Sequence, residues 1–343
     1  MTTAEAVGVV VIGRNEGERL QRCLLSLKGS GITRLVYVDS GSTDGSVTLA
    51  RSMRFEVHEL DTSAGFTMAR GRNAGFAALL ERYPDLRYVQ FVDGDCEVES
   101  GWIEKGRACL DAKPRVGAVA GRRRERHPEA SVYNLLADIE WDQPVGLVKA
   151  TGGDVMMRVE AFREGGGFNG AMIAGEEAEM FIRVRARGWR VCRLGESMTL
   201  HDAAMTRLGQ WWRRTRRTGH AYAEGFALHG GAPEFHHRRE VLRTLLWAGL
   251  MPLLFMVSAG LGLLVSAWWW LMAAGVALLH VVMFVKIGLG CQDDRGRPQW
   301  WYAWFIVLGK YPELLGILTY VVNRVRGKTT PLIEYHRPPA GVN

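Results

Sequence analysis

Cysteine is scarce in this sequence, and its spacing excludes two classes of site. The five cysteines are odd in number and widely separated, and none belongs to a Cys-x-x-Cys pair. They are Cys23, Cys96, Cys109, Cys192 and Cys291. Such spacing favours neither a disulfide framework nor a structural zinc site. We therefore expect the chain to work in a reducing compartment.

The N-terminus lacks a basic segment followed by a long apolar core. Its apolar run Val7–Ile12 is too short for the core of a signal peptide and fits a first β-strand instead. An extreme composition is also absent, because 23% charged and 48% hydrophobic residues in a chain of 343 are typical of a folded protein. Disorder is therefore excluded except at the ends.

Short apolar runs alternate with helix-like stretches up to about residue 200. The predicted strands are Val7–Ile12, Leu35–Val38, Tyr88–Val92 and Val116–Ala120. This alternation is typical of an α/β fold in which helices cover both faces of a doubly wound, mostly parallel sheet. We expect this domain to occupy residues 1–206.

The C-terminal third is apolar enough for a membrane region at residues 241–343. Residues 245–265 and 268–287 are almost free of charge and long enough for two transmembrane helices, with tryptophans and arginines beside them. Buried core helices are the weaker alternative. Residues 300–322 carry Lys310, Pro312 and Glu313 near their middle, which predicts a re-entrant or in-plane hairpin. A third crossing would also export the basic residues that follow, against the positive-inside preference.

The net charge of +7 comes largely from arginines close to these apolar segments. Residues 207–240 are predicted to form a basic amphipathic region that lies on anionic lipid headgroups. Its first arginines are Arg207, Arg213, Arg214, Arg216 and Arg217. The same charges suit the phosphates of a donor or lipid acceptor, and both alternatives stay open. The run Arg122–Arg126 is predicted to be a solvated loop, with acceptor contact as its alternative. No nucleic-acid module is recognisable.

The predicted strand Tyr88–Val92 stops at two carboxylates in Asp93-Gly94-Asp95. The carboxyl ends of strands form the edge at which open α/β sheets bind ligands. Two carboxylates there can hold Mg²⁺ or Mn²⁺ against a diphosphate. Taken alone, such a triplet is more often a solvated turn.

Other polar motifs follow in a fixed order along the chain. The runs Arg14-Asn15-Glu16 and Asp39–Gly45 each follow a predicted strand. Later motifs are Ala69–Asn73, Gly175-Glu176-Glu177 and Gln210–Arg214. This succession resembles the family 2 inverting glycosyltransferases, which have a GT-A fold and a membrane-attached C-terminus. The resemblance covers about residues 5–220 and rests on the order of the motifs.

The resemblance implies a nucleotide-sugar site at the sheet edge. Asp39 would contact the uracil or ribose, while Asp95 with Asp93 would hold Mg²⁺ or Mn²⁺ on the diphosphate. The other residues implied in donor binding are Arg14, Asn15, Glu16, Arg72, Asn73, Gly94, Arg213 and Arg214. Ser40 stands where many members have a second Asp, a departure that affects the expected donor preference.

The resemblance also implies a general base and an acceptor site. Glu177 occupies the position of the Asp in the family's Glu-Asp pair and would deprotonate the acceptor hydroxyl. Glu176 would either orient this base or cap a helix. Gly153 and Asp154 would lie under the acceptor. His201 would either complete the metal shell or serve as a structural histidine.

The predicted function is transfer of a single sugar from a nucleotide-diphosphate sugar, expected to be UDP-linked, to a lipid-linked or membrane-proximal acceptor. The enzyme would belong to glycan or glycolipid assembly, with its catalytic domain on the cytoplasmic side of the inner membrane. Two alternatives are a polyprenyl-phosphate glycosyltransferase and a catalytically silent nucleotide-binding scaffold. A scaffold would have no use for Asp95 and Glu177 together. The motif at Gln210–Arg214 lacks the Arg-Trp ending of processive members.

Overall fold

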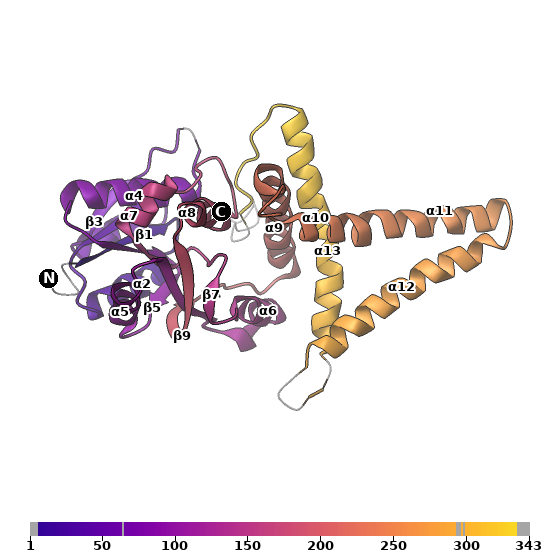
Figure 1. The fold of residues 1–343 in the computed structure, drawn as a ribbon, viewed down its shortest axis with the longest axis horizontal. Coiled ribbons are helices and arrows are strands. Elements are labelled where there is room, and N and C mark those ends of the chain that lie inside the picture. The colour runs from indigo at the N-terminus through magenta and orange to yellow at the C-terminus, as the bar shows by residue number, and fades with distance from the viewer. Residues whose placement is uncertain (1–5, 64, 293–295, 298, 335–343) are drawn as a thin grey trace. The chain divides into compact units, whose positions relative to one another are not determined.

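The computed structural model describes residues 6–63, 65–292, 296–297 and 299–334. Contacts within the chain divide it into two compact units, Met1–Arg207 and Leu208–Asn343. The first unit is an α/β domain and the second is helical (Figure 1).

The first unit alternates strands and helices, as the sequence predicts (Figure 1). Its elements are β1 (Val7–Gly13), α2 (Glu18–Gly29), β2 (Leu35–Asp39), α3 (Ser46–Ser52), β3 (Glu56–Glu59), α4 (Met68–Arg82), β4 (Tyr88–Asp93), β5 (Cys96–Val98), α5 (Trp102–Ala112), β6 (Val116–Glu125), η1 (Pro128–Ala130), α6 (Val132–Trp141), β7 (Gly146–Val148), β8 (Val155–Arg158), α7 (Val159–Gly165), α8 (Glu176–Ala186) and β9 (Arg190–His201).

The strands form a mixed sheet in the order β3-β2-β1-β4-β8-β6-β9-β5, with β7 paired to β9. Strands β1, β2, β3 and β4 run parallel to one another, whereas β8 is antiparallel to both β4 and β6. The predicted α/β fold is confirmed, but the sheet is mixed, since β6 pairs in parallel with β9 while β5, β7 and β8 pair antiparallel with their neighbours. An apolar run shows that a strand is buried and carries no information on its direction.

Helix α4 packs closely on β1 and β2 because two glycines face the sheet. A Cβ at Gly75 would collide with Val10 and Val38, and one at Gly71 would touch Ile12 at 3.4 Å. The hydroxyl of Thr67 caps the helix by accepting the backbone N–H of Arg70 at 3.2 Å. This packing holds the first turns of α4 beside the carboxyl edge of the sheet.

Three strands end side by side at that edge. In the parallel register Gly13 pairs with Asp39, and Ile12 pairs with Asp93. The turns after β1, β2 and β4 therefore meet, which brings together motifs that are up to about 80 residues apart in sequence.

The second unit consists of helices. They are α9 (Leu208–His229), α10 (Arg238–Thr244), the π-helical η2 (Leu245–Leu250), α11 (Met251–Leu264), α12 (Trp269–Gly290) and α13 (Trp300–Val325). Three stretches are long and apolar enough to cross a membrane: Arg238–Leu264, Trp269–Gly290 and Trp300–Val325. The first two cover the predicted spans except for one residue each, Val265 and Trp268.

The third stretch corrects the shape expected from the sequence. Trp300–Val325 is one continuous helix instead of a hairpin, and Pro312 lies inside it. The ammonium of Lys310 lies 2.7 Å from the carboxylate of Glu313, so the two charges that suggested a break neutralise each other one turn apart. Proline inside such a helix is tolerated where neighbouring helices pack against it.

Candidate functional site

The turns after β1 and β2 are tied together by side-chain hydrogen bonds. Asp39 is buried, and its Oδ2 accepts the backbone N–H groups of Gly41 and Ser42 at 2.9 and 2.8 Å. Asn15 donates its own N–H to Ser42 Oγ at 2.9 Å and accepts the Thr43 N–H at 2.7 Å. Asp39 and Asn15 thus shape one rim of the sheet edge. Arg14 lies beside them, 4.1 Å above the ring of Phe66.

Arg72 on α4 connects the edge to the start of α8. Its guanidinium is only 1% exposed, and its Nη2 donates to Asp93 Oδ1 at 2.7 Å. Its Nη1 lies 2.9 Å from Glu176 Oε1 and 3.3 Å from Glu177 Oε1. Three carboxylates from two distant parts of the sequence therefore share one buried cation. Burial disfavours the charged guanidinium, but Asp93, Glu177 and Glu176 outweigh it and raise the pKa of Arg72.

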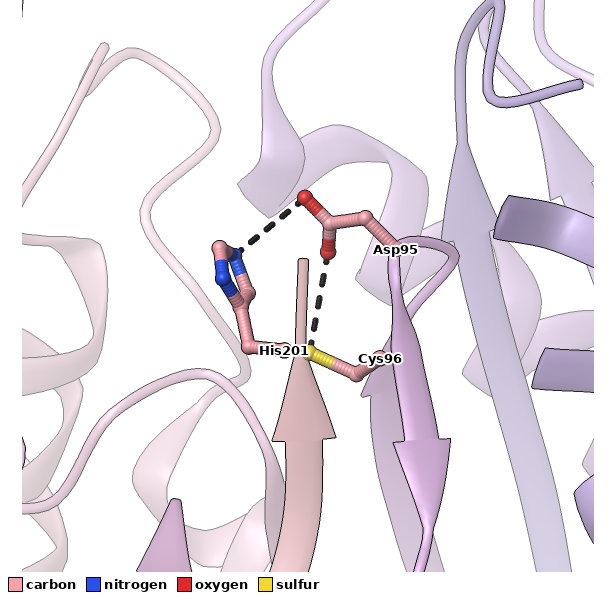
Figure 2. Close-up of side chains that lie close together, drawn as sticks. All are labelled: Asp95, Cys96 and His201. Atoms are coloured by element: carbon pink, nitrogen blue, oxygen red, sulfur yellow. Dashed lines mark hydrogen bonds and ion pairs between the residues drawn. The ribbon is translucent and has the colours of Figure 1, made fainter. Parts of the chain in front are cut away.

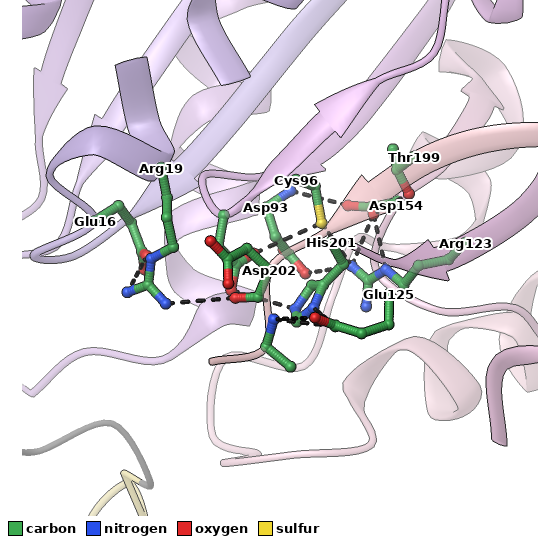
Figure 3. Close-up of polar contacts among 12 residues, drawn as sticks. Glu16, Arg19, Asp93, Cys96, Arg123, Glu125, Asp154, Thr199, His201 and Asp202 are labelled. Atoms are coloured by element: carbon green, nitrogen blue, oxygen red, sulfur yellow. Dashed lines mark hydrogen bonds and ion pairs between the residues drawn. The ribbon is translucent and has the colours of Figure 1, made fainter. Parts of the chain in front are cut away.

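Arg123 is a second buried cation, and the sequence interpretation missed it. The predicted loop Arg122–Arg126 instead continues strand β6, which ends at Glu125. Arg123 donates from Nη2 to Asp93 Oδ2 at 2.9 Å and from Nε to Asp154 Oδ2 at 2.9 Å (Figure 3). Basic residues in succession suggest solvent exposure, but ion pairs with Asp93 and Asp154 keep the side chain of Arg123 only 17% exposed.

Asp154 completes this ion-paired group. Its Oδ1 accepts the backbone N–H of Asp93 at 2.9 Å, and its Oδ2 also accepts the hydroxyl of Thr199 at 2.8 Å. Asp154 is 1% exposed. In this structure it therefore supports Asp93 and Arg123, and its predicted place under the acceptor stays a prediction.

Asp95 and His201 face each other at the end of β4 and β9. Asp95 Oδ2 lies 3.3 Å from His201 Nε2 (Figure 2). The other ring nitrogen lies 3.4 Å from Glu125 Oε2. Burial alone would lower the pKa of His201, but the two carboxylates outweigh it and raise the pKa to about 9. Burial likewise opposes ionisation of Asp95, but His201 dominates and lowers the pKa of its carboxyl.

Glu16 is a third acid on this side of the site. Its Oε2 lies 2.8 Å from Arg19 Nη2 (Figure 3). Burial, reinforced by the negative charge of Asp95, raises the pKa of Glu16 to about 8 despite this ion pair. Gly94 lies beneath it, since a Cβ there would approach Glu16 Cγ to 3.3 Å.

The fold implies a divalent cation, and Asp95 with His201 fits one. Ligand atoms of Asp95, Cys96 and His201 all lie within 4.8 Å of one another. Burial raises the pKa of Cys96 well above its usual value, so it stays a neutral thiol and a poor ligand for a hard cation. A carboxylate and an imidazole suit Mn²⁺, so Asp95 and His201 would hold the ion.

The second acidic group does not fit a cation in the same way. Asp93, Cys96 and Asp154 also lie within 4.8 Å of one another. The guanidinium of Arg123 already bridges both carboxylates, however, and Arg72 takes the other oxygen of Asp93. Asp93 is thus the partner of two arginines in this structure, and its role as a metal ligand beside Asp95 stays a prediction.

Glu176 and Glu177 open helix α8 after Gly175, which has a φ of 80°. Glu176 is 1% exposed, whereas the side chain of Glu177 is 20% exposed. Gly153 lies against this pair, because a Cβ there would collide with Arg72 Nη2 and lie 2.9 Å from Glu177 Oε1. Glu177 is thus the carboxylate of the pair that can reach a bound molecule.

Three more residues are expected from the sequence to contact the donor. Asn73 uses its amide group to hold the loop before α8, donating to the Phe168 carbonyl at 2.7 Å and accepting its N–H at 2.9 Å. Arg213 and Arg214 belong to α9 in the second unit. Their part in phosphate binding stays a prediction.

Known proteins resemble this chain in sequence and in fold. The family Glycosyl transferase family 2 matches residues 8–146. The pre-mycofactocin glycosyltransferases of two Mycobacterium tuberculosis strains, CDC 1551 / Oshkosh and ATCC 25618 / H37Rv, are each 28% identical over 221 residues. This alignment covers 60% of the chain and 44% of each relative, so the chain spans less than half the length of these relatives.

A solved structure extends the likeness to the fold. The mannosyltransferase PcManGT from Pyrobaculum calidifontis, in complex with GDP-Man and Mn²⁺, has a TM-score of 0.63 and 17% sequence identity. The superposition covers 93% of this chain and 88% of that one. At this identity the likeness establishes the fold alone.

Proposed function

We propose that this chain is a family 2 glycosyltransferase that transfers one sugar from a nucleotide-diphosphate donor to a membrane-proximal acceptor with inversion. The proposal is supported by the family match over residues 8–146 and by the likeness in fold to PcManGT. The reaction needs a cation beside the leaving nucleotide and a base at the acceptor hydroxyl. The residues offered for these roles are Asp95 with His201 for the cation and Glu177 for the base.

The observation that carries this proposal is the separation of the two roles by Arg72 and Asp93. Asp95 pairs with His201 on one side, whereas Glu177 pairs with Arg72 on the other. Arg72 and Asp93 join the two sides through a 2.7 Å ion pair. An inverting transfer uses two carboxylate sites with different duties, and this arrangement supplies them.

Each chain residue has a defined task in the proposed reaction. Glu177 accepts the proton of the acceptor hydroxyl, and Arg72 holds this carboxylate in place. Asn15 and Asp39 shape the rim on which the nucleoside rests. A bound Mg²⁺ or Mn²⁺ would neutralise the charge that develops on the departing diphosphate.

The acceptor is proposed to be lipid-linked or close to the bilayer. This rests on three helices of the second unit that are long and apolar enough to cross a membrane, and on the arginines of α9. A catalytic domain on the cytoplasmic side of the inner membrane is part of the same proposal. We favour a UDP-sugar, and the GDP-Man bound by PcManGT makes GDP-sugars the first donors to compare.

The proposal is tested by nucleotide release from UDP-, GDP- and dTDP-sugars. Purified protein in detergent is supplied with Mn²⁺ and membrane lipid extract, beside the Asp95→Asn and Glu177→Gln variants. We expect turnover with one donor that needs the extract and is lost in both variants. Metal-dependent donor binding without turnover in any extract would instead support a silent nucleotide-binding scaffold.

The closest alternative is a polyprenyl-phosphate glycosyltransferase. A phosphate acceptor is already ionised and needs no strong base, so Glu177→Gln would then retain most of the activity while Asp95→Asn would not. Comparing a polyprenyl phosphate with a hydroxyl-bearing glycolipid as acceptor, with both variants, separates the two functions.

A further inference from the structure

Helices α9 and α13 of the second unit pack against each other over about four helical turns. Their contacts advance together along both helices. The matching positions are Trp211 with Phe305 at 5.2 Å between ring centroids, Thr215 with Gly309, Gly219 with Glu313, and His220 with Tyr320 at 5.3 Å between ring centroids. Because residue numbers rise in the same direction, the two helices are parallel.

Glycines bring the two backbones into direct contact. A Cβ on Gly316 would collide with the carbonyl oxygen of Arg216, and a Cβ on Gly219 would collide with the backbone of Glu313. Arg216 also donates to the hydroxyl of Thr319 at 2.9 Å. Small residues at a crossing allow close helix packing, so α9 and α13 behave as one element.

The pairing of α9 with α13 affects whether α13 can cross a membrane, because α9 is strongly basic. It carries Arg213, Arg214, Arg216 and Arg217 within five residues and no acid before Glu224. If α13 crossed the bilayer, α9 would have to accompany it and take these arginines into the hydrocarbon. Charged side chains in that position are costly.

Both ends of the α11–α12 hairpin also meet α13. Thr244, just before the first span, donates to Glu313 Oε2 at 2.6 Å. Phe284, in the last two turns of α12, stacks on Trp300 with ring centroids 5.7 Å apart. In Figure 1 α13 runs across the direction of α11. The hairpin therefore starts and ends on the same side of a membrane, and α13 bridges its open end.

The face of α13 that is turned away from α9 is apolar and exposed along its whole length. Its residues recur every three, four or seven positions, which places them on one side of a helix. They are Trp304, Tyr311, Leu315, Leu318, Val322 and Val325, from 38% to 82% exposed. The opposite side, with Gly309, Glu313 and Gly316, is the one that contacts α9.

We propose that α13 lies in the surface of the membrane instead of crossing it, with the stripe from Trp304 to Val325 inserted among the lipids and α9 packed on its other side. The partner is the bilayer itself, whose anionic headgroups suit the arginines of α9. Only the α11–α12 hairpin crosses. This inference concerns the second unit and does not depend on which sugar is transferred.

Side-specific labelling of the full chain in bacterial spheroplasts tests the topology. A membrane-impermeant maleimide should label Ser266→Cys, at the tip of the hairpin, in intact spheroplasts. Lys328→Cys, just after α13, should be labelled only after lysis. Labelling of Lys328→Cys from outside would show that α13 crosses and would overturn the proposal. Protection of Ser266→Cys would equally overturn it, because the hairpin would not cross.

Cross-linking in native membranes tests the helix pair independently. A Cβ at Gly309 lies 3.7 Å from the Thr215 methyl carbon, so Thr215→Cys with Gly309→Cys should form a disulfide on mild oxidation. The matched control, Thr215→Cys with Leu315→Cys, should not, because Leu315 is on the exposed stripe. Equal cross-linking of both pairs, or of neither, would contradict a fixed α9–α13 pair.

Discussion

Arg72 pairs with Glu177 at 3.3 Å while its own guanidinium is almost completely buried. The same guanidinium binds Asp93 at 2.7 Å and Glu176 at 2.9 Å. A buried charge held by three carboxylates cannot move to a new position without leaving some of them unpaired. The placement of the proposed base therefore depends on a residue of α4, about 100 residues earlier in the chain.

Replacing Arg72 should impair catalysis more than donor binding. We expect Arg72→Met to lower kcat about 100-fold, because Glu177 loses the group that positions it. The unpaired Asp93 and Glu176 should also cost about 3–5 kcal/mol of stability. Steady-state kinetics and thermal unfolding in detergent measure the two effects. Arg72→Lys keeps the charge and should recover part of both. A folded Arg72→Met variant with normal kcat would contradict this role.

Asp93 and Asp95 should respond differently to the same substitution. Asp95→Asn is expected to weaken Mn²⁺ binding about tenfold or more with little loss of stability, because Asp95 faces the cation position beside His201. Asp93→Asn should instead lower the unfolding temperature, since it breaks ion pairs with Arg72 and Arg123. Calorimetric Mn²⁺ titrations and thermal scans of both variants decide this. Equal losses of Mn²⁺ affinity would mean that both carboxylates bind the ion.

Binding of Mn²⁺ should release a proton from His201. The pKa of His201 is raised to about 9, so without the ion its ring is protonated at pH 7.5. An imidazole must be neutral to bind a metal, and the affinity should therefore rise about tenfold per pH unit until pH 9. Titration calorimetry in buffers of different ionisation enthalpy should detect close to one proton. His201→Asn should bind more weakly and release none. Release of no proton by the unmodified protein would remove His201 from the metal shell.

The same shift predicts how pH affects the protein without metal. The pKa of His201 in the fold lies above its usual value of about 6.5, so its pairing with Asp95 stabilises the fold fully below that value. This contribution is lost as the pH rises through about 9. Thermal scans between pH 6 and pH 10 should show the decline, and His201→Asn should flatten it. A decline of equal size in that variant would assign the effect to other groups.

The sequence predicted the carboxyl-edge motifs because strand ends in a parallel sheet meet at one edge. The turns carrying Asn15, Asp39 and Asp93 converge for this reason. The pairing of Arg72 with Glu177 could not be predicted from the strand ends, because it depends on how closely α4 and α8 approach the edge of the sheet. The basic neighbours of Arg123 suggested solvent exposure, whereas its ion pairs with Asp93 and Asp154 depend on contacts between residues far apart in the sequence.

In the helical unit, too, the sequence predicted one part of the structure correctly and another part wrongly. Hydropathy predicted two spans, and the structure has helices there. The charged middle of the third stretch suggested a break, because a sequence does not show that Glu313 is satisfied by Lys310 and by Thr244 on another helix. Local polarity therefore predicted the wrong shape for α13, since contacts between distant residues determine whether a buried charge is tolerated.

Gly153 provides the most selective test of the link between Arg72 and Glu177. A Cβ at this position would collide with Arg72 Nη2 and approach Glu177 Oε1 to 2.9 Å. Arg72 cannot swing aside, because its ion pairs with Asp93 and Glu176 hold it. Gly153→Ala should thus displace the base and lower kcat about 10–100-fold, since small misplacements of catalytic groups have effects of this order.

The neighbouring glycine supplies the matched control for this prediction. A Cβ at Gly152 would meet nothing within 4 Å, so Gly152→Ala should keep near-normal activity and stability. Both positions have backbone angles open to alanine, and the comparison isolates the clash from any effect of backbone stiffness. Kinetics and thermal unfolding of the two variants measure it. If Gly153→Ala were as active as Gly152→Ala, the position of Arg72 would not control the base, and the chemistry would have to be assigned to another carboxylate.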